Sequence, residues 1–372
     1  MSHKTLFTIT FSKFAQGAHT RHKEMVRQLL NLGWEVYWIG LSEQDLLVSV
    51  DGSQVDKLHF IKGKFEVLCK IPFLGKLIYA FLNKCIFNIT HKKTITHHLY
   101  LNNYLALGGF LATYKKIFFF CRMDIYTQYK NRMLQKNTKT NRFVLVFLKT
   151  VQYLTLCISE KYIVQTEPLK TEIVSRFNKK FRVEVLPNNA FIRKSKNERK
   201  MNETIKIGFM ANMHWEMKGL DILSEYFQQF SSFDEQIVIA GDGPDLDKLK
   251  TNLNIPNVNY LGRVDGEKFL LDIDVLLVTT RFDYCPNILL EAMSFGVPII
   301  ASNIPVHRYL LGDEHPGLFD IGNVDNIRQK INQFKLNKDN FIRCQNEQVK
   351  SFYFNWGDKV EMLLLNEVRD ES

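Results

Sequence analysis

The sequence predicts an α/β protein made of two doubly wound domains, each built on a parallel sheet. The chain has 372 residues, which is long for one hydrophobic core, and 45% of them are hydrophobic. Strand-like runs alternate with helix-like runs in both halves, as they do in βαβ units. The net charge changes sign between the halves: residues 1–200 hold 33 Lys and Arg against 13 Asp and Glu, and residues 201–372 hold 16 against 26. A first half at +20 favours an anionic partner, although lysine-rich faces also keep a Phe-rich protein in solution.

The first domain opens with a strand–loop–helix–strand unit. Residues 6–10 read as the strand, and Gly33 ends the helix. Gly17 lies in the loop between them, either facing a ligand or serving as an ordinary turn glycine. His19 and His22 have a metal-compatible spacing of three, but no third ligand accompanies them. We therefore expect both histidines to be solvated helix residues.

Residues 71–93 form the most membrane-like stretch of the chain. Lys76, Asn83 and Lys84 interrupt its apolar run, so a membrane span is not expected. The mixture of apolar and basic residues suits a helix lying among anionic headgroups. It equally suits a core helix of the first domain with a rim of lysines, and the sequence leaves both interpretations open.

A buried strand at residues 116–121 leads into Arg122 and Asp124. In open parallel sheets the carboxyl ends of strands line the ligand crevice. Arg122 could pair with a phosphate there, and Asp124 could orient or deprotonate an acceptor hydroxyl. A structural Arg122–Asp124 pair is the alternative. The basic and aromatic stretch that follows, residues 126–153, carries no recognised RNA-binding motif, which favours a solvated loop and helix over a single-stranded nucleic acid site.

The second domain begins after residues 192–203, which are charged, lack apolar periodicity and predict a linker. Its strands are expected at residues 205–210, 236–240, 258–262 and 274–280. The second strand runs into Gly241-Asp242-Gly243, where Leu246 replaces the third glycine of a dinucleotide fingerprint.

The most informative stretch is residues 283–302, which predict a loop, a short helix, a tight stop and a buried strand. Pro286 fixes φ ahead of a helix that starts near Asn287, and Gly296 can take a left-handed cap. The backbone N–H groups and positive dipole end at the start of this helix suit a phosphate or diphosphate.

Two carboxylates stand eight residues apart in this stretch. Asp283 lies in the loop ahead of the helix, and Glu291 lies one turn into it. One acidic group can therefore stand on either side of the anion pocket, an arrangement that suits a sugar nucleotide.

Residues 283–302 resemble the E-x(7)-E region of retaining glycosyltransferases of family 4, and PNILLEAMSFGVPIIAS matches almost residue for residue. Lys218-Gly219 resembles the K-G element of the same family. The resemblance implies the GT-B fold, with two Rossmann-like domains facing across a cleft. It also implies a retaining transferase that moves a hexose-type sugar from a nucleotide-diphosphate sugar to a hydroxyl of a glycan or lipid-linked glycan, in bacterial surface polysaccharide synthesis.

The resemblance also implies roles for individual residues. Lys218 would clamp the donor diphosphate, Asp283 would contact the donor sugar and Glu291 the ribose; Asp124 completes the expected catalytic set. The expected donor-binding positions are Gly17, Asn212, Lys218, Gly243, Arg263, Asp283, Pro286, Asn287, Ile288 and Glu291.

Two positions depart from the family pattern. Asp283 stands where Glu is usual, which shortens the reach by one C–C bond, about 1.5 Å. Asn212 stands where Arg is usual, so half of the positive clamp is present.

No metal and no cofactor are expected, because no D-x-D element stands at a strand end. The expected partners are a nucleotide-sugar donor, a glycan or polyprenyl-diphosphate-linked acceptor and an anionic membrane surface, without specific nucleic acid. Six cysteines without a C-x-x-C pair and a start without a leader predict a cytoplasmic location, peripheral on the inner face of the plasma membrane.

The expected domains are an acceptor-binding domain at 1–191, a nucleotide-sugar-binding domain at 204–350 and a C-terminal helix at 351–372 that crosses back to the first domain. Two other classes stay open. Asp283 and Asn212 are compatible with a non-catalytic binding protein on a degenerate transferase scaffold. A dinucleotide-dependent oxidoreductase also uses βαβ units, although the missing third glycine counts against it.

Overall fold

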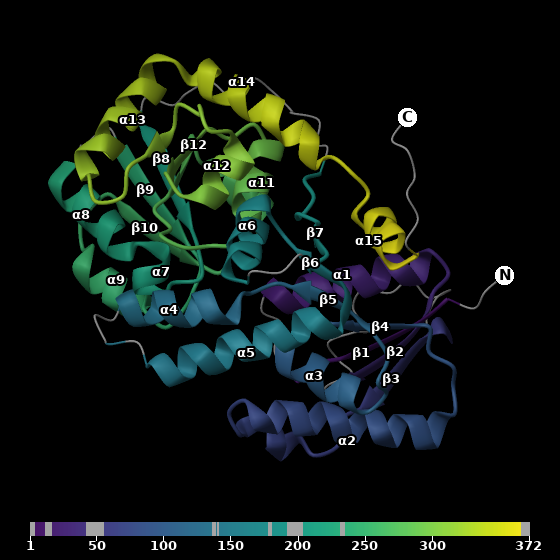
Figure 1. Cartoon of the computed structure of the whole chain (residues 1–372). Coiled ribbons are helices and arrows are strands. Elements are labelled where there is room, and N and C mark those ends of the chain that lie inside the picture. The colour runs from purple at the N-terminus through teal and green to yellow at the C-terminus, as the bar shows by residue number, and fades with distance from the viewer. Residues whose placement is uncertain are drawn as a thin grey trace. The chain divides into compact units, whose positions relative to one another are not determined.

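The computed structural model describes residues 4–11, 17–41, 56–135, 139, 141–177, 181–191, 204–230 and 235–365 (Figure 1). The chain divides into two compact units, Met1–Leu186 with Asn355–Ser372, and Pro187–Phe354. The expected linker at residues 192–203 lies outside the described residues. Within the described ranges, none of the helices combines the length and the apolar character that a membrane crossing requires.

The first unit is built on a seven-stranded parallel sheet with the order β3-β2-β1-β4-β5-β6-β7. Its strands are β1 (Thr5–Ile9), β2 (Glu35–Gly40), β3 (Leu58–Lys62), β4 (His97–Tyr100), β5 (Ile117–Cys121), β6 (Ser159–Val164) and β7 (Val183–Val185). Its helices are α1 (Gly17–Asn31), η3 (Glu66–Lys70), α2 (Leu74–His91), α3 (Asn103–Leu111), α4 (Ile125–Gln135), α5 (Arg142–Ile158), α6 (Glu167–Arg176) and α15 (Trp356–Leu365).

The last helix of the chain completes this first unit. Figure 1 shows α15 beside α1, and the two helices are in contact. Glu361 on α15 accepts hydrogen bonds from the Trp34 indole N–H at 2.7 Å and from the Lys4 ammonium at 2.9 Å. Segments more than 300 residues apart in sequence are thereby joined through one carboxylate.

The second unit is built on a six-stranded parallel sheet with the order β10-β9-β8-β11-β12-β13. Its strands are β8 (Ile205–Met210), β9 (Glu235–Ala240), β10 (Val258–Gly262), β11 (Val275–Val278), β12 (Ile299–Ser302) and β13 (Leu318–Phe319). Its helices are α7 (Trp215–Lys218), α8 (Leu220–Phe230), α9 (Leu246–Asn252), α10 (Gly266–Asp272), α11 (Asn287–Ser294), α12 (Pro305–Leu311), α13 (Val324–Leu336), α14 (Lys338–Val349) and η4 (Lys350–Phe352).

Both sheets are doubly wound, which confirms the predicted fold class. In the second unit the chain moves outward from β8 to β10, then returns to β11 and continues on the other side to β13. The strand order therefore reverses between β8 and β11, and the carboxyl ends of these two strands are neighbours. Ligands of open α/β sheets bind at such a switch point.

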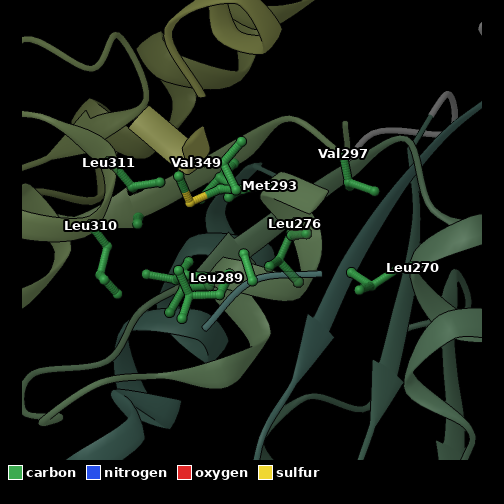
Figure 2. Packing of buried hydrophobic residues seen from close by; sticks show 14 of the residues in the cluster. Leu270, Leu276, Leu289, Met293, Val297, Leu310, Leu311 and Val349 are labelled. Atoms are coloured by element: carbon green, nitrogen blue, oxygen red, sulfur yellow. The ribbon is translucent and has the colours of Figure 1, made fainter. Parts of the chain in front are cut away.

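The helix predicted after Pro286 is present as α11 and is fixed by a buried cluster (Figure 2). Leu289 and Met293, four residues apart on α11, point into this cluster with Leu276 of β11 and Val349 of α14. Gly296 follows the helix with φ 64°, the left-handed cap expected from the sequence. Core packing thus sets the direction in which the start of α11 points.

The membrane-like stretch, residues 71–93, begins directly after η3 and contains helix α2. The central turns of α2 are a core element, because Tyr79, Ala80, Asn83, Lys84 and Phe87 are buried. The buried Asn83 amide is satisfied, because its nitrogen donates to the Lys64 carbonyl and its oxygen accepts from the Lys64 N–H. The burial of these turns supports the interpretation as a core helix of the first domain.

Candidate functional site

The loops at the carboxyl edge of the second sheet carry most of the predicted site residues. The loops after β10, β9, β8 and β11, in the spatial order of the sheet, carry Arg263, Gly243, Lys218 and Asp283 respectively. Parallel strands deliver all their carboxyl ends to one edge, so segments spread over 65 residues converge there.

Lys218 and Asp283 form an ion pair at the β8–β11 switch point. The Lys218 Nζ lies 2.6 Å from the Asp283 Oδ2, and the two side chains are 15% and 21% exposed. Burial raises the pKa of Asp283, but the Lys218 ammonium and the Tyr284 N–H outweigh burial and hold this pKa below its ordinary value. The site therefore holds an ionised carboxylate and a cation that has further N–H donors for an incoming anion.

The loop that carries Lys218 is held by the end of β11. The Thr279 hydroxyl donates to the Lys218 carbonyl at 2.8 Å, and the Arg281 N–H donates to the Met217 carbonyl at 3.0 Å. The Arg281 guanidinium also binds Asp221 with two hydrogen bonds of 2.6 Å. Gly219 must be glycine here, because its φ is 62° and a Cβ would lie 2.1 Å from the Thr279 carbonyl oxygen.

The start of α11 is held by a residue that the sequence reasoning missed. Pro286 is the N-cap and its side chain makes no capping hydrogen bond. The buried Asn188 amide donates to the Cys285 carbonyl at 3.1 Å and to the Asn287 side-chain oxygen at 2.6 Å. Asn188 follows β7 by three residues, and its contact with a loop almost 100 residues later has no local sequence signal.

Glu291 and the loop after β10 lie together. The Glu291 Oε2 is 3.4 Å from the position that a Cβ on Gly266 would occupy. Gly266 is the first residue of α10, and Arg263 is three residues earlier. The second acid of the pair therefore faces a different loop from Asp283, so the two acids stand at separate parts of this edge.

Asn212 and Gly243 also lie side by side. A Cβ on Gly243 would lie 2.7 Å from the Asn212 side-chain oxygen and 2.5 Å from the Met213 N–H nitrogen. Arg263 is exposed and pairs with Asp242 at 3.2 Å. The loop after β9 therefore contacts both the loop after β8 and the loop after β10. Arg263 is a long, exposed cation at the outer side of these loops.

His307 is a buried neighbour of the Lys218–Asp283 pair that was not anticipated. It is completely buried, and its Nδ1 lies 2.8 Å from the Ser302 carbonyl oxygen. Burial lowers the pKa of His307 to about 4, with the Ser302 carbonyl and Asp283 opposing the shift. The imidazole is therefore neutral beside the charged pair.

Asp124 belongs to the first unit and is fully buried. Its carboxylate accepts hydrogen bonds from Arg176 at 2.6 and 3.0 Å, from Thr127 at 2.5 Å and from Gln152 at 2.7 Å. This network favours a structural role, with Arg176 on α6 as a partner that the sequence analysis did not name. Nothing in it presents a carboxylate oxygen to an acceptor hydroxyl.

Two further predictions concern α1. Gly17 is its first residue, so it stands at a helix start after β1, and the preceding loop lies outside the described residues. The expectation that His22 is solvated is wrong. Its Nε2 lies 2.9 Å from the Thr8 hydroxyl, and its ring stacks on Trp38 with centroids 4.5 Å apart, so it is a core residue.

Among the described residues, no three His, Cys, Asp or Glu side chains are grouped so that they could hold a metal ion. The cations around the site are provided by Lys218, Arg263 and Arg281.

Comparisons with known proteins bear on both units. Residues 204–336 match the family described as glycosyl transferases group 1. An uncharacterized glycosyltransferase of Haemophilus influenzae is 25% identical over 254 residues, which cover 65% of this chain and 69% of that protein. The O-antigen biosynthesis glycosyltransferase WclY of Escherichia coli is 27% identical over 142 residues, 37% of this chain and 39% of WclY.

Solved structures agree with the whole fold. Sucrose-phosphate synthase from Thermosynechococcus elongatus superposes with a TM-score of 0.76 at 14% identity, covering 98% of this chain and 100% of that one. Anabaena HepE in complex with UDP-glucose gives 0.72 at 13% identity with the same coverage. The two doubly wound sheets and the solved structures show a fold of the GT-B type, and the second unit, which carries the Lys218–Asp283 pair, is similar to glycosyl transferases group 1.

Proposed function

We propose that the chain is a retaining family 4 glycosyltransferase that moves a hexose-type sugar from a nucleotide-diphosphate sugar to a hydroxyl of a glycan or lipid-linked glycan. The observation that carries the proposal is the Lys218–Asp283 pair at the β8–β11 switch point, beside the loop that feeds α11. A cation beside the loop that leads into a helix start suits a diphosphate that gains charge as it departs.

The proposed reaction places its largest electrostatic demand on the leaving group. The bond between the anomeric carbon and the diphosphate oxygen breaks, and its electron pair stays on that oxygen. The Lys218 ammonium and the N–H groups of Asn287 and Ile288 stabilise this developing charge. Pro286 sets the approach of the chain to these N–H groups.

Retention follows if attack and departure share one face of the sugar. The acceptor oxygen then bonds to the anomeric carbon, and its proton passes to the departing diphosphate oxygen. No side chain acts as a covalent nucleophile in this scheme. Asp283 orients the donor sugar, and Glu291, near Gly266, holds the ribose.

The remaining donor contacts come from neighbouring loops of the same edge. Asn212 and Gly243 allow close approach of the backbone to the donor, and Arg263 lies at the rim near the base. Gly17 at the start of α1 is proposed to serve the donor or acceptor from the first unit. No metal takes part in the proposal. Asp124 is retained as a position to be tested and not as the preferred acceptor base.

The acceptor is proposed to be a glycan or a polyprenyl-diphosphate-linked glycan of a bacterial surface polysaccharide. The +20 charge of residues 1–200 suits an anionic acceptor and an anionic membrane surface. The similarity to WclY, whose name places it in O-antigen biosynthesis, supports the same class of product. We place the enzyme in the cytoplasm, peripheral on the inner face of the plasma membrane.

The test is a thermal-shift screen of the full chain against UDP, GDP, ADP and their sugars, with EDTA present. A ligand that binds only the folded state raises the melting temperature by mass action, so one base should give a selective rise. Lys218→Ala and Glu291→Ala should abolish it. The matched control is Lys206→Ala, because Lys206 pairs with Asp272 at 2.8 Å at the opposite, amino-terminal edge of the same sheet.

Donor hydrolysis and transfer are then measured with the selected sugar nucleotide, and nuclear magnetic resonance of the product reports its anomeric configuration. Retention without added metal supports the proposal. A product with inverted anomeric configuration contradicts the proposed mechanism. So does a ligand-induced rise in melting temperature that EDTA removes. Binding without turnover on any glycan acceptor favours the degenerate scaffold, and a bound chromophore absorbing like a nicotinamide or flavin favours the oxidoreductase.

A further inference from the structure

The first unit exposes an unusual number of large apolar side chains on two neighbouring segments. Five of them lie in or next to η3 and at the start of α2: Phe65, Val67, Ile71, Phe73 and Leu74. Three lie on the first turns of α5: Phe143, Val146 and Phe147. We call these eight residues the apolar patch. Phe143 is 87% exposed, Val67 71% and Val146 65%, values that a side chain in a protein core never shows.

The two segments form one surface. The Phe73 ring lies 5.4 Å from the Phe147 ring and 5.6 Å from the Tyr104 ring, so Phe73 bridges α3 and α5. Helix α3 packs against both α2 and α5. Phe143, Val146 and Phe147 stand three and four residues apart, which places them on one face of α5. Contiguous exposed apolar surface of this kind marks an interaction site.

Two phenylalanines of the patch are held in backbone conformations that bulky residues avoid. Phe65 has φ 61° and Phe73 has φ 57°, and each is the N-cap of the helix that follows it. Gly or Asn would adopt these values at lower cost. Strained positions occupied by exposed aromatic side chains point to a function for the side chain that outweighs the local cost.

The segments that carry the patch also carry exposed cations. Lys62 and Lys64 precede η3, Lys70 ends it, and Arg142 and Lys149 lie on α5. Glu66 is the one acidic residue of the sequence between positions 62 and 76, and positions 139–149 contain none. The basic end of α2 at residues 90–93 lies far from these cations, since an 18-residue helix is about 27 Å long.

The geometry points to an anionic lipid surface as the partner of the apolar patch, with η3 and the starts of α2 and α5 entering the headgroup region. Apolar side chains ringed by Lys and Arg are the composition of interfacial membrane anchors. A second copy of the chain fits less well, because a symmetric contact would set like charges against each other. Single-stranded nucleic acid fits less well, because Val67, Ile71, Leu74 and Val146 offer no ring for a base to stack on.

This inference takes its setting from the proposed function but names the surface that would meet the membrane. It differs from the expectation raised by residues 71–93, because the central turns of α2 are buried and α5 supplies half of the patch. A lipid-linked acceptor would be met at the membrane by the unit that carries the patch.

The experiment is co-sedimentation of the full chain with phosphatidylcholine vesicles, with and without phosphatidylglycerol, in the absence of sugar nucleotide. Binding is expected to the anionic vesicles at low salt and to weaken as salt is added. Phe143→Ser with Val146→Ser should weaken partitioning about tenfold or more, because each removes an apolar side chain from the headgroup region. The double charge reversal Lys70→Glu with Arg142→Glu should do the same on anionic vesicles.

Matched controls come from the second unit. Leu336 on α13 is 88% exposed, so Leu336→Ser removes an equally exposed apolar side chain, and Lys350→Glu reverses an exposed cation. Both should bind vesicles as the unchanged chain does. Every variant is also melted with and without the selected nucleotide, so that a failure of folding or of donor binding is seen separately from a failure of membrane binding.

Absence of binding to anionic vesicles at low salt would overturn the inference. So would patch variants that bind as well as the controls. If sedimentation velocity instead showed a concentration-dependent dimer that the Phe143→Ser, Val146→Ser variant abolishes, without vesicle binding by the unchanged chain, the patch would be a self-association surface.

Discussion

At the scale of single residues, the proposed chemistry of the second unit rests on Lys218 and Asp283. Their 2.6 Å pairing neutralises two charges that are mostly shielded from solvent. Asp283, one carbon shorter than the usual glutamate, nevertheless reaches the ammonium. In the proposed reaction, a diphosphate would compete with the carboxylate for this cation or join it there.

Lys218→Met should lower kcat/KM for transfer by about 10²–10³-fold, as removal of one preorganised charge donor does in other enzymes. It should also change the pH profile. The ammonium lowers the pKa of Asp283, so without it this pKa rises and the acid limb of kcat/KM moves to higher pH. Steady-state kinetics across acid pH measure both effects.

The control for this variant is Lys206→Met, which breaks the exposed Lys206–Asp272 pair at the other edge of the sheet. Its activity and its acid limb should be unchanged. A Lys218→Met enzyme with normal kcat/KM would remove Lys218 from the mechanism, and an unmoved acid limb would show that Asp283 does not control it.

Short elements fix the position of these residues. α7 is a single turn, and Lys218 is its last residue. The direction of its side chain depends on the left-handed Gly219, on Thr279 and on the Arg281–Asp221 pair. Residues directly after β11 thus hold the loop after β8 in place. The loop after β11 continues from these residues to Asp283.

Gly219→Ala should lower the free energy of unfolding of the second unit by about 3 kcal/mol and greatly reduce activity. Left-handed φ alone costs an alanine about 1 kcal/mol, and a Cβ at 2.1 Å from the Thr279 carbonyl oxygen forces the Lys218 loop away from β11. Denaturant melts and donor binding by thermal shift measure the two effects.

Gly322→Ala is the matched control, because Gly322 has φ 93° and nothing lies within 4 Å of its Cβ position. It should lose only the backbone contribution and keep full donor binding. Equal losses of stability in the two variants would show that the close approach to Thr279 does not constrain the loop.

Buried histidines govern the response of the whole molecule to acid. Burial lowers the pKa of His98 to about 3 and the pKa values of His307 and His315 to about 4, against an ordinary value of 6.5. The unfolded chain binds protons to these rings below pH 6.5 while the folded chain does not. Stability is therefore full above that pH and is lost as pH falls towards 4.

Each buried histidine should add a slope on the order of 1.4 kcal/mol per pH unit in this window. Calorimetric unfolding of the full chain between about pH 7 and about pH 4.5 measures it. His307→Gln should flatten the slope by one histidine's share even if it lowers stability at neutral pH. His91→Gln, on the exposed end of α2, should leave the slope unchanged, and an unchanged slope in His307→Gln would contradict the burial argument.

Much of the fold was readable from the sequence because its signals are local. The runs of β-branched and aromatic residues before Gly-rich or Pro-containing loops predict the strands. Pro286 directly precedes α11, and Gly296 follows its C-cap residue, Phe295. The loops that carry Lys218, Gly243 and Arg263 were placed correctly, since each follows a recognisable strand. Asn188, His307 and Arg281 were not singled out, because their roles depend on contacts with distant segments.

Contacts with distant segments also decide what the sequence left open or what was predicted wrongly. The expectation that His22 is solvated was wrong, because its ring packs against Trp38 in the core. For residues 71–93 the sequence left two interpretations open, and the buried central turns of α2 support the core helix. Asp124 and Arg122 are near neighbours in sequence, yet the carboxylate is held by Arg176, 52 residues away. Sequence spacing cannot rank such partners, because burial decides which cation a carboxylate meets.

The sequence by itself determined that this protein has two doubly wound α/β domains, and that a short helix starts after Pro286 with one acid before it and one within it. Periodicity, glycine and proline positions suffice for that, because they act through local backbone geometry. Only the tertiary structure decided that Lys218 meets Asp283, that the two acids face different loops, and that α5 joins η3 and α2 in one apolar surface. Those outcomes depend on strand order and on which side chains lose their solvent, and neither is written in any single segment of the chain.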